Sequence, residues 1–190
     1  GLKNVFVTNG YMTRQALARL DGLLHAANVD LKGFTDGYYR RVIGARLGPV
    51  KRSIALMLEM GTWVEVTTLL VPGLNDDSEE LRSLAAFLAS LSTDIPWHIS
   101  RYYPSYRLLD VPPTPVSTIE RACVIGKEAG LNYVYAGNIP GHACESTVCP
   151  KCGQEVISRT GFSIRRTNLN GNCCGTCGAE LPLIGVEVQP

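Results

Sequence analysis

Four of the seven cysteines in this chain are spaced so that they could bind one metal ion. They form two Cys-x-x-Cys pairs, Cys149 with Cys152 and Cys174 with Cys177, and 21 residues lie between the pairs. Each pair makes a tight turn that directs two thiolates at one centre, so two such turns close a tetrahedral site of four sulfurs. The pattern is typical of a zinc ribbon, and the stretch between the pairs has room for a short hairpin around Arg159 to Arg165.

Other uses of these cysteines remain open from the spacing alone. A rubredoxin-like iron site has similar spacing, and Cys-x-x-Cys pairs can be redox-active, although thioredoxin-type pairs follow a strand and begin a helix. Cys144, Cys149 and Cys152 also form the C-x4-C-x2-C of a ferredoxin-type cluster, but the ribbon makes better use of the last two. We therefore expect structural Zn²⁺ on four cysteines, with Cys123 in the core and Cys144 and Cys173 without a metal.

A second group of chemical side chains lies where a predicted strand ends. Asp30 and Lys32 are two residues apart, so both side chains face the same side of that strand. Burying an inward-facing Asp and Lys at a strand end costs free energy, which a bound polar ligand would offset. The alternative is a buried ion pair without a functional role, in which the two side chains only neutralise each other. Lys32 could also form a Schiff base with a carbonyl substrate. Either chemical role predicts a pocket beside these residues.

Two other strand ends carry polar groups. The turn Thr8-Asn9-Gly10 offers backbone donors and a side-chain amide to a small polar ligand, or it is an ordinary strand-to-helix turn. His98 and Ser100 share one face of a later strand. A lone histidine on a strand is more often a hydrogen-bonded core residue than a catalyst.

Five apolar runs alternate with segments of helical period, which predicts an α/β fold with a parallel sheet and right-handed crossovers. The runs begin near residues 4, 27, 63, 97 and 133. Leucine stripes mark helices at Leu17–Leu24 and Leu81–Leu91, and Asp77 with Glu80 is a capping box before the second. Polar residues at the carboxyl ends of the strands favour part of a barrel over a doubly wound open sheet, because barrel enzymes collect their chemistry there.

Composition limits the class of protein. The 190 residues are 45% hydrophobic and 18% charged, which describes one sizeable core with a small appendage. The net charge of +1 gives no field that would attract a polyanion or an anionic membrane. No apolar run approaches the roughly 18 to 20 residues that span a bilayer, so we expect a cytoplasmic protein. A change of composition near residues 137–148 predicts two domains, 1–140 and a ribbon at 147–185.

The ordered motifs resemble those of radical S-adenosylmethionine (SAM) enzymes over nearly the whole chain. The chain is most similar to the radical SAM member of the AmmeMemoRadiSam system, which is itself similar to pyruvate formate-lyase activating enzymes. The motifs that carry the resemblance, apart from the terminal ribbon, are VFVTNGY (5–11), NVDLK (28–32), VEVTTLLVPG (64–73), WHISRYYP (97–104) and PPTPV (112–116).

This resemblance implies a partial (β/α)6 barrel in which a [4Fe-4S] cluster binds SAM. The reduced cluster cleaves SAM to a 5'-deoxyadenosyl radical, which abstracts hydrogen from a substrate or from a glycine of a partner enzyme. The D-x-K motif that contacts the methionine moiety falls on Asp30 and Lys32, and the T-N-G motif begins at Thr8. The SAM-binding residues implied in this way are Thr8, Asn9, Asp30, Lys32, Thr67, His98, Ser100 and Tyr103.

The chain departs from this family in one large respect. It contains neither the C-x3-C-x2-C motif that binds the cluster nor the Gly-Gly-Glu motif, and no cysteine precedes Cys123. The strand at Val5–Thr8 corresponds to the family's third strand. We therefore expect an N-terminally truncated barrel, or half of a split protein, whose cluster ligands lie elsewhere and which is inactive alone. Its catalytic residues stay unassigned.

Two functions of other kinds remain open. One is a lyase that forms a Schiff base at Lys32. The other is a binding module in which the ribbon recruits a protein partner. Nucleic acid is disfavoured as the ribbon's partner, because four basic residues meet three acidic ones between Thr147 and Pro190.

Overall fold

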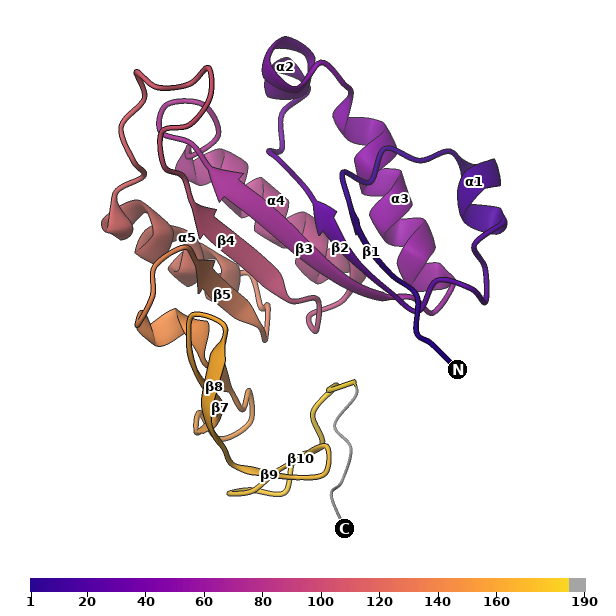
Figure 1. Cartoon of the computed structure of the whole chain (residues 1–190), viewed down its shortest axis with the longest axis vertical. Helices are drawn as coiled ribbons and strands as arrows, with labels where there is room; N and C mark the ends of the chain where they lie inside the picture. The colour runs from indigo at the N-terminus through magenta and orange to yellow at the C-terminus, as the bar shows by residue number, and fades with distance from the viewer. Residues whose placement is uncertain (185–190) are drawn as a thin grey trace.

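A parallel five-stranded sheet forms the larger part of the molecule in a computed structural model that describes residues 1–184 (Figure 1). Its strands are β1 (Val5–Thr8), β2 (Ala26–Asp30), β3 (Trp63–Leu70), β4 (Trp97–Arg101) and β5 (Val134–Gly137). The order in the sheet is β1-β2-β3-β4-β5, the same as in the chain. The five strands predicted from the apolar runs are therefore all present and parallel.

The helices that connect these strands cover one face of the sheet. They are α1 (Arg14–Ala18), α2 (Asp36–Tyr38) with the π-helical turn η1 (Tyr39–Ile43), α3 (Leu47–Glu59), α4 (Ser78–Leu91) and α5 (Val116–Glu128). Because each strand lies beside the next strand in the chain, right-handed crossovers bring every helix to the same side. A doubly wound sheet would reverse its strand order. The observed order therefore favours the predicted barrel portion over the doubly wound alternative.

Side chains alternate between the two faces of the sheet. On the helix side Val29, Val66, Trp97 and Ile99 are fully buried and form the centre of the main core. Residues paired in register share a face, so the strands carry a mostly polar row on the side without helices, which we call the open face. The polar and aromatic members of the open face include Asn28, Asp30, Glu65, Thr67, His98, Ser100 and Tyr135, and Val5, Val7, Ala26, Trp63 and Leu69 share the same face.

The helix ends depart from the sequence prediction in two places. Helix α1 ends at Ala18, earlier than the leucine stripe predicts, and the chain reaches Leu24 through a turn in which Gly22 has a φ of +71°. Asp77 caps α4 as predicted, but the capping box is only half formed, because the Glu80 carboxylate instead accepts a hydrogen bond from the Phe34 backbone N–H. That bond joins α4 to the loop after β2.

The rest of the described chain is a small antiparallel unit below β5 in Figure 1. It follows the 3-10 turn η2 (Ala143–Glu145) and contains β6 (Thr147–Val148), β7 (Glu155–Thr160), β8 (Ser163–Thr167), β9 (Leu169–Asn170) and β10 (Cys173–Cys174). Strands β7 and β8 form the predicted hairpin. This unit, which we call the ribbon, has its own cluster of buried residues around Cys149, Val156 and Cys174. The predicted end of the ribbon at residue 185 lies outside the described residues.

Within residues 1–184, no helix has both the length and the apolar character that a membrane crossing requires.

Candidate functional site

Asp30 and Lys32 form an ion pair at the carboxyl end of β2. Lys32 Nζ lies 3.0 Å from Asp30 Oδ2, and the two side chains are 40% and 36% exposed. Leu31 between them is fully buried on the helix side, which turns its two neighbours to the other side. A pair this accessible contributes little stability of its own. Both groups are therefore free to exchange their mutual contact for a charged ligand.

The accessibility of Lys32 also bears on Schiff-base chemistry. Lysines that form Schiff bases are activated by a desolvated pocket or by a neighbouring cation. Lys32 instead has an anionic partner, Asp30, and a side chain that is 40% exposed. The observed surroundings fit a residue that binds an anion better than one that attacks a carbonyl.

A buried asparagine fixes the backbone that carries Lys32. Asn75 is 2% exposed, and its side-chain amide donates to the carbonyl oxygens of Lys32 at 2.7 Å and Leu69 at 2.9 Å. Its Oδ1 accepts a hydrogen bond from the Val71 N–H at 2.7 Å. One side chain thus ties the end of β2 to the end of β3. The sequence patterns gave no indication of this positioning role of Asn75.

A second buried chain of hydrogen bonds supports the same edge. Trp97 Nε1 donates to Thr68 Oγ1 at 3.0 Å, and Thr68 Oγ1 donates to the Leu31 carbonyl at 2.9 Å. The Tyr39 hydroxyl accepts from the Lys32 N–H at 3.1 Å. The Leu31 carbonyl and the Lys32 N–H belong to one peptide group, so these bonds fix the backbone between Asp30 and Lys32.

The T-N-G turn after β1 is held by its own side chains. Thr8 Oγ1 accepts from the Gly10 N–H at 3.1 Å, and Asn9 Oδ1 accepts from the Tyr11 N–H at 3.0 Å. Gly10 has a φ of +67°, and a Cβ there would lie 2.7 Å from Val29 Cγ1, so glycine is required. Thr8 pairs in register with Val29, which places its side chain on the helix side, whereas Asn9 is exposed at the strand end.

Ser100 and Tyr103 lie at the carboxyl end of β4. Ser100 lies on the open face against Gly137. A Cβ at position 137 would lie 2.7 Å from Ser100 Oγ. The Arg101 guanidinium stacks 4.9 Å from the centre of the half-exposed Tyr103 ring and donates to its hydroxyl at 3.0 Å. The Tyr103 hydroxyl in turn donates to the Asn138 carbonyl at 3.3 Å. Tyr103 is thus anchored across the ends of β4 and β5.

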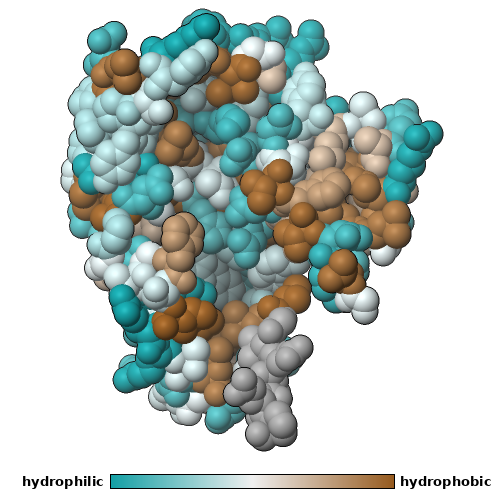
Figure 2. Space-filling view, viewed as in Figure 1, coloured by the Kyte–Doolittle hydropathy of each residue, from teal (hydrophilic) through white to brown (hydrophobic). Residues whose placement is uncertain are grey.

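A cavity of about 890 Å³ lies between the open face and the ribbon. Figure 2 shows it as a hollow with a largely hydrophilic floor and apolar side chains along the ribbon side. Of the predicted SAM residues, Thr67, His98 and Ser100 line it. Asp30, Lys32, Thr8, Asn9 and Tyr103 are not among its lining residues, so the predicted set divides between the strand ends and the cavity.

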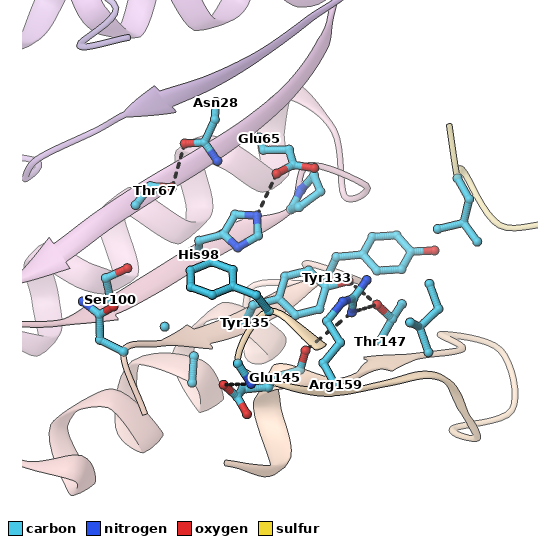
Figure 3. A pocket seen from close by; sticks show the side chains of 18 of the residues that line it. Asn28, Glu65, Thr67, His98, Ser100, Tyr133, Tyr135, Glu145, Thr147 and Arg159 are labelled. Carbon is cyan, nitrogen blue, oxygen red and sulfur yellow. Dashed lines mark hydrogen bonds and ion pairs between the residues drawn. The ribbon is translucent and has the colours of Figure 1, made fainter. Parts of the chain in front are cut away.

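Glu65 and His98 are the central polar pair of the cavity (Figure 3). His98 Nε2 lies 2.9 Å from Glu65 Oε2, and Trp63 Nε1 donates to Glu65 Oε1 at 3.2 Å. The hydrogen bond from His98 is the main reason that the pKa of Glu65 lies below its usual value. The His98 ring stacks on Tyr135 with the ring centres 5.2 Å apart. Sequence reasoning missed Glu65, although its position two residues before Thr67 predicts the same face.

The four ribbon cysteines meet in the geometry of a metal site. Their sulfurs lie within 4.8 Å of one another, and the Cys149–Cys177 and Cys152–Cys174 sulfur pairs are each 3.7 Å apart. A tetrahedral Zn²⁺ with bonds of about 2.3 Å separates its sulfurs by roughly 3.8 Å, so this arrangement fits that ion. No other such group of His, Cys, Asp or Glu occurs in residues 1–184.

The two cysteine turns have the same backbone hydrogen bonds. Cys149 N–H donates to the Gln154 carbonyl, and Cys174 N–H donates to the Ala179 carbonyl, both at 2.8 Å. The glycine after each pair, Gly153 or Gly178, has a φ near +70° and donates to the carbonyl of the first cysteine of its turn. The repeated Cys-x-x-Cys-Gly pattern is a signal in the sequence that the spacing argument did not use.

Backbone amides also favour the thiolate form of Cys174. The N–H groups of Cys177 and Thr176 lower the pKa of Cys174 to about 6.

Cys144 and Cys173 lie outside the four-sulfur group, and Cys123 is buried in the main core. Cys144 packs against that same core, which argues against a ferredoxin-type site with Cys149 and Cys152.

Comparisons with known proteins bear on this architecture. No family model matches the chain. The uncharacterized protein MJ0808 of Methanocaldococcus jannaschii is 41% identical over 187 residues, which are 97% of this chain and 55% of that protein. The chain therefore spans about half the length of this curated relative.

Two solved structures resemble the chain in fold. A domain of the pyruvate-formate lyase-activating enzyme from Bacteroides vulgatus superposes with a TM-score of 0.63 and 15% identity, covering 71% of this chain and 81% of that one. A radical SAM methyltransferase from Sphaerobacter thermophilus gives a TM-score of 0.53 and 19% identity, covering 77% and 43%. At these identities the likeness concerns the fold, and it confirms an α/β fold like that of radical SAM enzymes. The AmmeMemoRadiSam resemblance stays a prediction.

Proposed function

We propose that this chain is the C-terminal part of a radical SAM enzyme and that its strand ends help to bind SAM. The observation that carries the proposal is the accessible Asp30–Lys32 pair at the carboxyl end of β2, in a fold shared with radical SAM enzymes. Lys32 Nζ would donate to the carboxylate of the methionine moiety, and Asp30 would accept from its amino group. Asn75 keeps the backbone of that pair in place.

The other predicted SAM residues supply the surroundings of this contact. Asn9 and Tyr103 lie at the ends of β1 and β4, and Ser100 and Thr67 lie on the open face between the strand ends and the cavity. When SAM is bound to a reduced [4Fe-4S] cluster, its one-electron reductive cleavage makes hydrogen abstraction possible. We propose that the ligands of that cluster lie outside residues 1–184. Within those residues, the four ribbon cysteines are the one group of side chains arranged to bind a metal.

The remaining parts of the proposal concern the ribbon and the partner. We assign the four ribbon cysteines to a structural Zn²⁺ that joins the two turns, because the sulfur separations match a tetrahedral ion. The hydrogen donor is either a small substrate or a glycine of a partner enzyme. The division into a barrel portion, 1–140, and a ribbon from residue 147 is part of the same proposal.

Titration of the ¹⁵N-labelled chain with SAM, followed by NMR, tests this function. We expect the amide signals of Asn9, Asp30, Lys32 and Tyr103 to move. A hydrogen bond to a charged group is worth about 1.5–3 kcal/mol, so Lys32→Met should weaken SAM binding by about tenfold to 100-fold.

The matched control for that variant is Glu79→Gln, which removes another exposed ion pair, the one with Arg82 on α4. It should leave SAM binding unchanged. The proposal is wrong if SAM moves no signals at the strand ends, or if Lys32→Met and Glu79→Gln bind SAM equally well. Borohydride trapping with small aldehydes and ketones is a separate check, because a covalent adduct at Lys32 would favour the lyase.

A further inference from the structure

The cavity between the open face and the ribbon has walls from both parts of the molecule. Its volume of about 890 Å³ lies within the roughly 300–1,000 Å³ of sites that hold small molecules. The sheet contributes the Glu65–His98 pair and Tyr135, and the ribbon contributes Thr147 and Arg159 (Figure 3). A ligand in this space would touch both units at once.

Arg159 gives the cavity a cation without an anionic partner. Its guanidinium donates to Thr147 Oγ1 at 2.6 Å and to the Glu145 carbonyl at 3.5 Å, which are neutral acceptors. Among the described side chains, no carboxylate oxygen lies within 4.0 Å of it. The neighbouring Glu145 carboxylate is engaged by the N–H groups of Gly141 and Gly161. Since a guanidinium has five N–H donors, Arg159 retains donors for a planar anion.

Flat aromatic surfaces stand beside this cation. The Arg159 guanidinium carbon lies 5.8 Å from the centre of the Tyr135 ring. Tyr135 is held by the stacked His98 and by a 2.9 Å hydrogen bond between its hydroxyl and Thr147 Oγ1. Tyr133 also lines the cavity, and its buried hydroxyl has no hydrogen-bond partner within residues 1–184. Rings fixed in this way favour a planar ligand, because little side-chain entropy is lost on contact.

The other charges limit the ligand to a single negative charge. Glu65 and Glu145 line the same cavity as Arg159, and among the described lining residues His98 is the only other titratable base. Glu65 already has His98 as its partner. A dianion such as a phosphate monoester would meet one cation and two carboxylates, whereas a monoanion needs only the free face of Arg159.

We propose that this cavity binds a small planar carboxylic acid, with its carboxylate on Arg159 and its ring beside Tyr135 and His98. The role of that acid as the substrate rests on the proposed function, whereas its binding does not. The Glu65–His98 pair lines the same cavity as the bound ring and offers a proton donor and acceptor there.

Benzoate is the probe, and ¹⁵N NMR of the whole chain is the readout. Benzoate should move the amide signals of Tyr135, Thr147 and Arg159, whereas benzamide, which has the same shape without the charge, should bind at least about tenfold more weakly. Arg159→Gln should weaken benzoate binding by a similar factor. The matched control is Arg166→Gln, an exposed arginine on β8 of the same hairpin, which should bind benzoate like the unmodified chain.

Three results would overturn the inference: benzoate moves no cavity signals, benzamide binds as well as benzoate, or both arginine variants bind benzoate equally well. The comparison of benzoate with benzamide uses the unmodified chain, so it decides the question even where Arg159→Gln does not fold. SAM and benzoate report on different amides. Loss of the benzoate response alone refutes the acid site, and loss of the SAM response at the strand ends alone refutes the proposed function.

Discussion

Asn75 offers the most direct test of how the strand ends are held. Replacing it with alanine removes both donors to the carbonyls of Lys32 and Leu69 and the acceptor for the Val71 N–H. Each buried backbone group left without a partner costs about 1–3 kcal/mol. Allowing for water that enters the space, we expect Asn75→Ala to lower the free energy of unfolding by about 3–5 kcal/mol.

Urea denaturation followed by circular dichroism measures this loss. Asn132→Ala is the matched control, since Asn132 is exposed and makes one side-chain hydrogen bond, to Asp94 at 2.7 Å. Its loss should stay below about 1 kcal/mol. Hydrogen exchange at the Lys32 amide should also accelerate in Asn75→Ala. The reasoning is refuted if Asn75→Ala costs no more than Asn132→Ala, because the three bonds would then not hold the two strand ends together.

Two further outcomes follow from the ribbon and the cavity. We expect metal analysis of the purified protein to find about one Zn²⁺ per chain, which Cys174→Ser should lose and Cys173→Ser should retain. Iron in place of zinc, or equal loss in both variants, would contradict the assignment. Glu65→Gln should be less stable than the unmodified chain at neutral pH, and the difference should shrink as the pH falls below 4.5. The pKa of Glu65 lies below that usual value, so its contribution is present above 4.5 and is lost as the carboxylate protonates; a difference in urea midpoint that does not change with pH would contradict this.

The sequence patterns were most informative where a single periodicity dominates. The apolar run that begins near residue 63 predicted β3 correctly. Asp77 caps α4 as predicted, because a capping aspartate accepts hydrogen bonds from backbone N–H groups of its own helix and needs no distant partner. The length of helix α1 was overestimated, because a leucine stripe does not show where a glycine such as Gly22 will turn the chain. Local patterns therefore placed the elements well and their ends less well.

The candidate sites depend on contacts between distant residues, and these were only partly predictable. The four-cysteine cluster was expected because the spacing of each pair is itself a local geometry. The pairing of Glu65 with His98 depends on the register of β3 against β4, which the spacing of either strand does not contain. Arg159 reaches Tyr135 because the hairpin folds back beside β5, and no pattern within the ribbon predicts that approach.

The agreement between strand order and chain order also bears on how the sheet forms. Strand pairs join residues 21 positions apart, as in Val5 with Ala26, or up to 37 apart, as in Ala26 with Trp63. The cost of closing a loop grows only with the logarithm of its length, so these pairings differ by about 0.5 kcal/mol in closure. Each strand can therefore add to its predecessor in a similar local step. The exposed edge at β1, where the Val7 side chain is 83% accessible, would accept another strand without rearrangement of the pairings already made.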